Sequence, residues 1–178
     1  MSQLTALLAL LVLDDLPRTG WILRGVPRPE SVAGHVLGTA FVALALGPRV
    51  EPPLDMRGVL TMALVHDVPE AATGDLPRRA GAWLPGGAKR EMEAAAAREV
   101  LEHLSLDAHA AFESYAASAT REARFVRLCD KLQLGVRLLG YQRAGQRGLE
   151  EFAANLRRLD CREFQVADEL RREILAAL

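Results

Sequence analysis

The chain has 178 residues, of which 50% are hydrophobic and 25% charged, and its formal net charge is −1. This length suits a single domain over residues 1–178 that buries a core without disulfides or structural metals. A charge so close to zero gives no reason to expect a nucleic acid polymer as partner, because such binding depends on neutralising many phosphates.

The first apolar stripe, capped by Ser2, predicts a helix, and similar stripes follow along the whole chain. No stretch shows the alternation of apolar and polar residues that is typical of a strand. Asp55 and Asp107 are the expected N-caps of two later helices. We expect about seven or eight helices, over residues 2–16, 31–46, 55–66, 88–104, 107–117, 120–139, 149–159 and 160–178. The predicted fold class is therefore all-α, a single helical bundle.

Two segments rich in glycine and proline, residues 18–29 and 74–87, are predicted loops. The apolar run at residues 6–13 is too short to span a bilayer, and no positively charged segment precedes it. Cys129 and Cys161 are too few for a disulfide scaffold. We therefore expect a cytoplasmic protein that does not interact with membranes.

Histidine and aspartate residues in three of the predicted helices carry most of the functional information. They are His35, the pair His66-Asp67, and Asp130. Unpaired histidines and carboxylates are costly to bury, so their convergence would indicate a shared ion. Imidazole nitrogen and carboxylate oxygen together suit a divalent ion such as Co, Mn, Fe, Ni or Zn. His66 and Asp67 can reach one ion only at a helix edge, which the nearby Pro69 favours.

Two further carboxylates follow the His-Asp pair. Glu70 lies one helical turn after His66 and on the same side, where it could move a proton to or from a reacting group. Asp75 is the second candidate for acid–base chemistry or substrate contact. A metal-bound water is acidic enough to supply hydroxide at neutral pH, so the set predicts a metal-dependent hydrolase.

The order His…His-Asp…Asp resembles the HD-domain metal-dependent phosphohydrolase superfamily. Two stretches narrow the resemblance to its 5′-deoxynucleotidase family: PRTGWILRGVPRPESV, which precedes the first histidine, and HDVPEAATGD, which holds the pair. The resemblance implies a homodimeric helical enzyme that hydrolyses deoxyribonucleoside 5′-monophosphates to deoxynucleoside and phosphate with a metal-activated water.

The resemblance also implies roles for single residues. The metal ligands would be His35, His66, Asp67 and Asp130, while Glu70 and Asp75 match the catalytic carboxylates. Trp21 matches a tryptophan that packs near the sugar and disfavours a 2′-hydroxyl, and Arg18 is a candidate for binding phosphate.

Three alternatives stay open at this point. The same site could act on another phosphomonoester or on a nucleotide diphosphate. The chain could instead be a non-catalytic helical module that holds a metal for stability. Finally, His103 and His109 lie where two-metal members of the superfamily have extra ligands, although surface histidines are the simpler interpretation.

Overall fold

The computed structural model describes residues 1–178, except for the side chain of Arg78. The regular secondary structure of the described residues consists of helices. The β-type pairing in them is limited to one isolated bridge between Pro17 and Ser31. The eight longer helices are α1 (Gln3–Leu10), α4 (Val32–Leu46), α5 (Met56–Val65), α7 (Ala88–Leu104), α8 (Leu106–Ala117), α9 (Arg121–Arg143), α10 (Glu150–Arg157) and α11 (Gln165–Ala177). Shorter turns are α2 (Val12–Asp15), α3 (Thr19–Ile22), α6 (Glu70–Thr73), and the 3₁₀ turns Gly47–Arg49 and Arg78–Trp83. The all-α prediction is confirmed.

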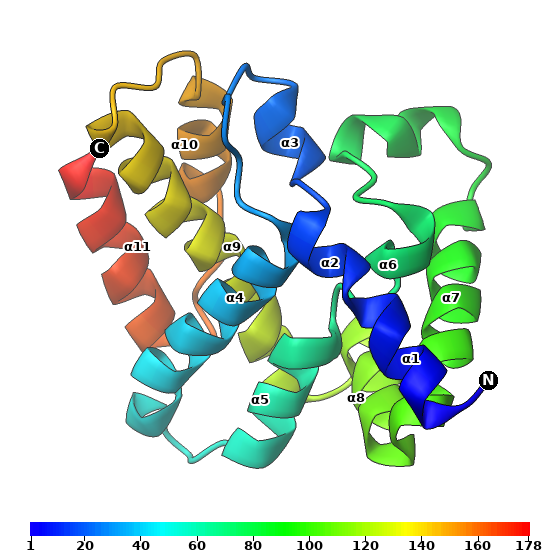
Figure 1. Cartoon of the computed structure of the whole chain (residues 1–178). Coiled ribbons are helices and arrows are strands. Elements are labelled where there is room, and N and C mark those ends of the chain that lie inside the picture. Colours follow the sequence, from blue (N-terminus) through cyan, green and yellow to red (C-terminus); the bar gives the residue numbers. More distant parts are fainter.

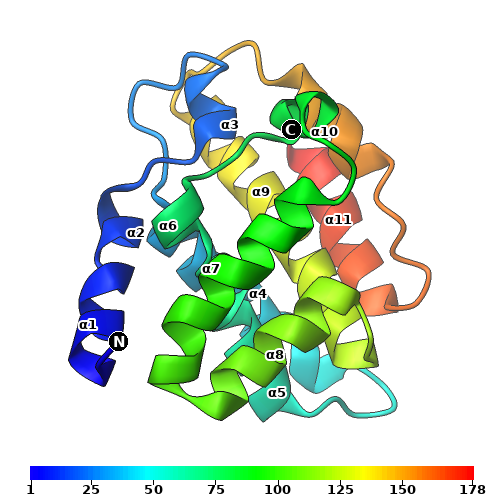
Figure 2. The same ribbon diagram turned by 90° about the vertical axis from the view of Figure 1, so that its right-hand side faces the viewer.

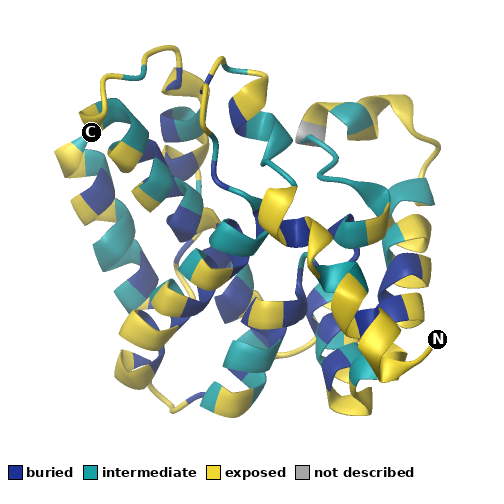
Figure 3. Ribbon diagram, viewed as in Figure 1, coloured by how far each residue is buried: buried dark blue, intermediate teal, exposed yellow. Residues whose placement is uncertain are grey.

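Helix α9 is the axis of the bundle, and α4, α5, α8, α10 and α11 all pack against it (Figure 1). Its side chains Phe125, Leu132 and Leu138 are fully buried. Each contributes roughly 1.5–3 kcal/mol through the apolar surface it removes from water. Figure 2 shows α7 and α8 together on the side that faces the viewer, with α9 passing behind them. Buried residues line the inward side of each of these helices (Figure 3).

Helix α4 is the most apolar segment of the chain. By length and composition alone, Val32–Arg49 is the one stretch of the described chain that could cross a membrane. The core helix of a globular protein has the same composition, and α4 packs against both α5 and α9. The helix carries His35, which is fully buried, into the centre of the bundle.

Hydrogen-bonded caps begin several of the helices. The predicted caps Ser2 and Asp55 are confirmed, because their side chains accept bonds from the backbone amides of Thr5 and Arg57. Capping side chains satisfy amides that the first helical turn leaves unpaired. Ser31 and Thr120 cap α4 and α9 in the same way.

Some predicted boundaries were wrong. The first helix is interrupted at Leu11, where tighter bonds from the amides of Leu11 and Asp14 replace the α-helical pattern. Asp107 is not a cap, because α8 already begins at Leu106, and its charge lies instead in the first turn. The last helix begins only at Gln165, since Asp160 bonds the amide of Arg162 and forms a turn. The predicted loops contain the short turns α3 and Arg78–Trp83.

Candidate metal centre and active site

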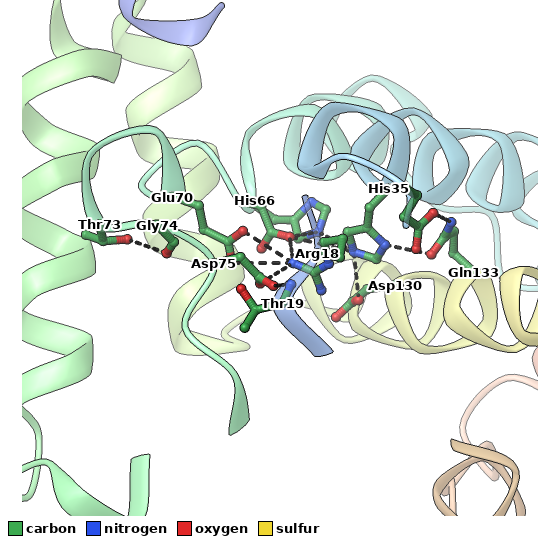
Figure 4. Close-up of polar contacts among 12 residues, drawn as sticks. Arg18, Thr19, His35, His66, Glu70, Thr73, Gly74, Asp75, Asp130 and Gln133 are labelled. Carbon is green, nitrogen blue, oxygen red and sulfur yellow. Dashed lines mark hydrogen bonds and ion pairs between the residues drawn. The ribbon is translucent and has the colours of Figure 1, made fainter. Parts of the chain in front are cut away.

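Four predicted ligand residues meet in the interior of the bundle. Ligand atoms of His35, His66 and Asp130 lie within 4.8 Å of one another, and all three residues are buried (Figure 4). The carboxylate of Asp67 joins them, because its Oδ2 lies 3.6 Å from His35 Nε2 and 3.4 Å from His66 Nε2. Asp130 Oδ1 lies 3.1 Å from His35 Nε2. The structure thus brings together the residues that the sequence predicted as ligands.

The end of α5 explains how two adjacent residues reach the same point. The helix ends at Val65 with His66 as its C-cap, and the chain then turns until Pro69 starts α6. Asp67 therefore leaves the helical path just after His66. This is the helix edge that Pro69 predicted.

Both histidines are oriented by a bond to the ring nitrogen that faces away from the cluster. His66 Nδ1 lies 2.9 Å from the carbonyl oxygen of Ala63, and His35 Nδ1 lies 2.6 Å from Gln133 Oε1. Since both partners are acceptors, each Nδ1 carries a proton and donates it. The Nε2 atoms face the centre of the cluster, where each can bind a metal cation in place of a proton.

The charges of the cluster also fit a cation. Burial opposes the ionisation of Asp130, but the Lys131 ammonium and His35 outweigh it and hold the pKa of Asp130 well below its usual range. At Asp67 burial is likewise outweighed, here by His66 and Arg18, so its pKa is lowered. Two ionised carboxylates and two oriented imidazoles form a donor set for a divalent metal ion.

Arg18 occupies the cavity side of this cluster. Its Nη1 atom lies 3.1 Å from Asp67 Oδ2, 3.3 Å from Glu70 Oε2 and 2.8 Å from Asp75 Oδ1. Asp75 also accepts a bond from the backbone amide of Thr19, so it ties the start of α3 to Arg18. The sharp turn back to Asp75 passes through Gly74, whose φ of +73° favours glycine. Asp75 therefore positions Arg18, a role that the sequence did not indicate.

Glu70 differs from its neighbours because it holds its proton. Burial and the charge of Asp67 raise the pKa of Glu70 to about 9, although Arg18 acts in the opposite direction. At neutral pH the carboxyl is therefore an acid with a proton to donate. A buried carboxyl with a raised pKa beside ionised carboxylates is typical of an acid–base catalyst.

This raised pKa predicts how the stability of the metal-free protein depends on pH. Glu70 binds its proton up to about pH 9 in the folded chain, but loses it near its ordinary pKa of 4.5 in the unfolded chain. Its contribution is thus complete below about pH 4.5 and is lost as the pH rises toward 9. Glu70→Gln should remove this dependence, so its melting temperature should exceed that of wild type increasingly between pH 5 and pH 9.

The measurement is thermal unfolding in the presence of a chelator. At pH 9 we expect a gain of at least about 2–4 °C, which corresponds to roughly 1 kcal/mol in a protein of this size. Glu169→Gln, at an exposed carboxylate paired with Arg49, is the control and should show no such trend. A constant difference between Glu70→Gln and wild type across this pH range would contradict the assignment.

A cavity of about 890 Å³ opens onto the cluster, a size suited to a small-molecule ligand. Arg18, Asp67, Glu70 and Asp130 form part of its wall. Trp21 also lines the cavity, but it is only 1% exposed, because its ring stacks on Phe152 with centroids 4.0 Å apart. The tryptophan predicted to lie near a sugar is therefore at the cavity wall and held rigidly.

Three residues beside the cluster were missed by the sequence reasoning. Gln133 contacts His35, Glu30 contacts Gln133, and the Tyr115 hydroxyl donates to Asp130 Oδ2 at 3.4 Å. Gln133 lies one turn after Asp130 on α9, which was the one available signal for it. His103 and His109, the extra ligands of the two-metal alternative, contact other residues. His103 Nε2 bonds the amino group of Met1, and His109 Nδ1 lies 3.9 Å from Glu102 Oε1.

Comparison with known proteins identifies the fold and the family. Residues 13–167 match the HD domain family. The chain belongs to the HD-domain family. This HD-domain protein is 29% identical to the 5′-deoxynucleotidase hdd1 of Schizosaccharomyces pombe, across 79% of its own length and 73% of the yeast protein. It is also 29% identical to the 5′-deoxynucleotidase HDDC2 of Homo sapiens, of which it spans 63%.

A solved structure has the same fold. A protein from Pyrococcus horikoshii OT3 superposes on the HD-domain protein with a TM-score of 0.84 at 28% identity. The alignment covers 98% of this chain and 99% of that one. The predicted membership of the HD-domain superfamily, and of its 5′-deoxynucleotidase-like family, is confirmed.

Proposed function

We propose that this HD-domain protein is a metal-dependent phosphomonoesterase that hydrolyses deoxyribonucleoside 5′-monophosphates. The observation that carries the proposal is the convergence of two histidines and two ionised carboxylates on one wall of a ligand-sized cavity, beside a protonated Glu70. The 5′-deoxynucleotidases to which the chain is similar support the substrate class.

The ligands of the metal would be His35, His66, Asp67 and Asp130. Bound there, a divalent Co, Mn, Fe, Ni or Zn ion lowers the pKa of a water ligand to near neutrality and polarises a phosphoryl oxygen. Arg18 lies against Asp67 and Glu70 at the cavity wall, so its guanidinium is placed to pair with a phosphate oxygen.

Glu70 supplies the proton that a phosphomonoester needs when its ester bond breaks. The leaving nucleoside 5′-oxygen would depart as an alkoxide unless it is protonated. With its pKa raised to about 9, Glu70 donates that proton at neutral pH. The contact between Glu70 Oε2 and Arg18 Nη1, 3.3 Å apart, supports this role, because Arg18 is the residue expected to pair with the phosphate.

Trp21 favours a deoxyribose because its buried indole offers no hydrogen-bond donor at the cavity wall. Its indole N–H already donates to Glu30 Oε1 at 2.9 Å, so it has no free donor for a 2′-hydroxyl. A hydroxyl against the ring would lose its water without gaining a partner. Apolar contact of this kind discriminates by roughly 10²-fold.

The cavity attracts anions over a wider area than the cluster itself. Basic residues on its wall, apart from Arg18, include Arg24, Arg79, Lys89, Arg90, Arg127, Lys131 and Arg158. Acidic residues on the same wall pair with three of them: Glu151 with Arg24, Glu93 with Lys89 and Asp130 with Lys131. The remaining basic residues raise the local concentration of an anionic substrate. This supports a nucleotide rather than a neutral ester.

The experiment is phosphate release from a panel of substrates by the metal-loaded protein. Deoxynucleoside 5′-monophosphates should be hydrolysed faster than ribonucleoside 5′-monophosphates, and both faster than nucleoside diphosphates or simple phosphomonoesters. A preference for ribonucleotides or pyrophosphates would overturn the role of Trp21. A protein that binds metal without hydrolysing any phosphoester would be the non-catalytic module.

We further infer that the protein is a cytoplasmic homodimer of single-domain chains. The free thiols Cys129 and Cys161 suit a reducing compartment. Helix α4 exposes an apolar row one turn apart: Leu37 is 52%, Phe41 60% and Leu44 47% exposed. Exposed apolar rows of this kind mark protein interfaces. Helices α1, α2 and α4 follow one another across this side of the bundle (Figure 1).

Phe41→Glu should therefore convert a dimer into a monomer, because it places a charge in the apolar interface. Mass measured by light scattering after size exclusion gives the result. Leu106→Glu is the matched control, since Leu106 is an exposed leucine on α8, and it should remain dimeric. A wild-type protein of monomer mass at micromolar concentration would contradict this inference.

A further inference from the structure

The buried carboxylate of Glu30 does more than accept the bond from Trp21 described above. Its side chain is only 1% exposed. It accepts three hydrogen bonds, from Trp21 Nε1 at 2.9 Å, Gln133 Nε2 at 2.8 Å and Arg137 Nε at 2.8 Å. All three partners are donors, so the two carboxyl oxygens of Glu30 accept at each of these contacts.

The bond to Gln133 decides which way its side-chain amide faces. Because Nε2 donates to Glu30, Oε1 faces His35 Nδ1, 2.6 Å away. His35 then presents Nε2 toward Asp67 and Asp130. A reversed amide would direct N–H groups at Nδ1, which would then have to accept. The ring proton would in that case lie on Nε2, where it competes with a metal ion.

The backbone of α4 is shaped for this amide. Gly38 lies three residues after His35 and therefore on the same side of the helix. A Cβ atom at Gly38 would lie 2.9 Å from both Cγ and Nε2 of Gln133. No side chain larger than hydrogen fits there unless Gln133 moves. The close approach of Gly38 to Gln133 is independent evidence that the packing of α4 against α9 fixes the position of the Gln133 side chain.

Glu30 is also held firmly through its backbone. Its amide donates to the Tyr141 hydroxyl at 2.7 Å, and its carbonyl oxygen accepts from the amide of Arg18 at 2.9 Å. The same residue thus contacts Arg18 and Trp21 on the substrate side and reaches His35 through one amide on the metal side.

We propose that Glu30 is a positioning residue that orients the metal ligand His35 through Gln133 and fixes the indole of Trp21, so that metal binding and substrate recognition depend on one carboxylate. The substrate half of this inference rests on the proposed function. The metal half does not, because metal affinity is measured without turnover.

The test compares the affinity of the full-length protein for Co²⁺, measured by titration calorimetry, in matched variants. The amide of Glu30→Gln has one oxygen for three donors, so its N–H groups oppose either Gln133, which must then turn, or Trp21. The Co²⁺ dissociation constant should rise about 10–100-fold, as on loss of other groups that orient a metal ligand. The KM for a deoxynucleoside 5′-monophosphate should rise as well, because Trp21 is released. Glu163→Gln, which breaks a surface pair with Arg124, is the control and should match wild type.

An exchange of the two side chains supplies the decisive variant. In Glu30→Gln combined with Gln133→Glu, the new carboxylate accepts from His35 Nδ1 and from the amide at position 30. That amide keeps its oxygen for Trp21. The exchange should restore the Co²⁺ affinity to within about threefold of wild type, as expected of a restored orienting contact. A purely structural role for Glu30 predicts no such recovery.

Two results would overturn the inference: Co²⁺ affinity unchanged in Glu30→Gln, or an exchange variant no better than the single variant. If Glu30→Gln does not fold, Gln133→Met replaces it, since it removes the acceptor of His35 at similar volume. Wild-type affinity in Gln133→Met would also overturn the inference. A wild-type protein that binds Co²⁺ but releases no phosphate with any of the five metals refutes the proposed function alone, and one that binds none of Co²⁺, Mn²⁺, Fe²⁺, Ni²⁺ and Zn²⁺ refutes both.

Discussion

Glu70→Gln is expected to lower kcat for phosphate release by about 10²- to 10⁴-fold while the metal remains bound, the range that general acid catalysis contributes. The amide keeps the shape of the protonated carboxyl and its contact with Arg18, but it has no proton to donate to the leaving oxygen. In the metal-free chain the pKa of Glu70 is raised to about 9, so the amide reproduces the protonated form of the wild-type residue. Steady-state phosphate release, with metal content measured on the same sample, gives the result.

Glu169→Gln on the surface of α11 serves as the control for this substitution too. It should keep wild-type kcat. If Glu70→Gln retains full activity, Glu70 is not the acid. If it loses its metal together with its activity, Glu70 acts by stabilising the centre, and the proton-transfer role is wrong.

Asp130→Asn is expected to lower metal affinity as well as activity, because it removes a ligand charge from the centre itself. Asp130 faces His35 Nε2 through one oxygen and the Lys131 ammonium through the other, at 2.8 Å. A neutral amide leaves that ammonium without its partner and gives the metal a weaker ligand. Metal affinity and kcat/KM should each fall by at least about 10²-fold, the upper loss seen when only supporting groups are removed.

The control for Asp130 is Asp160→Asn, which changes an exposed carboxylate paired with Arg162. It should bind metal and hydrolyse substrate like wild type. Asp130→Asn with wild-type metal content and activity would remove Asp130 from the ligand set and leave a centre of His35, His66 and Asp67.

The sequence predicted helices well where the signal is local. Ser2 and Asp55 cap their helices because a short polar side chain needs to reach an amide only two or three residues away. Asp107 has the same chemistry but is not a cap, since Ser105, two residues earlier, takes the extended conformation that separates α7 from α8. Ser105 occupies the N-cap position without a side-chain hydrogen bond, so the local contact that predicts a cap is absent at this boundary.

In the site, too, residues with a local sequence signal were predicted, and residues that meet only through tertiary packing were not. His66 and Asp67 were predicted to share an ion because Pro69 marks a helix edge, and the structure brings them together there. Glu30 and Gln133 carried no comparable signal. They are 103 residues apart, and their bond exists only because the segment before α4 lies against α9. Contacts of this kind follow from tertiary packing and not from spacing.

The protonation state of Glu70 and the ion pairs of Arg18 could not be predicted from the sequence for a similar reason. The phase of Glu70 relative to His66 indicated a nearby acid or base, but not which of the two. That choice follows from burial and from the charge of Asp67, which together keep Glu70 protonated. Likewise, the sequence predicted Arg18 as a phosphate contact, whereas its pairing with Asp67, Glu70 and Asp75 could be found only in the folded chain.

The most direct test of the whole account is phosphate release from a single deoxynucleoside 5′-monophosphate by protein stripped with a chelator and then given back one divalent metal at a time. We expect no detectable release from the stripped protein and full recovery with at least one of Co, Mn, Fe, Ni or Zn. Hydrolysis that continues in excess chelator, or stoichiometric metal binding with no hydrolysis for any of these ions, would contradict it.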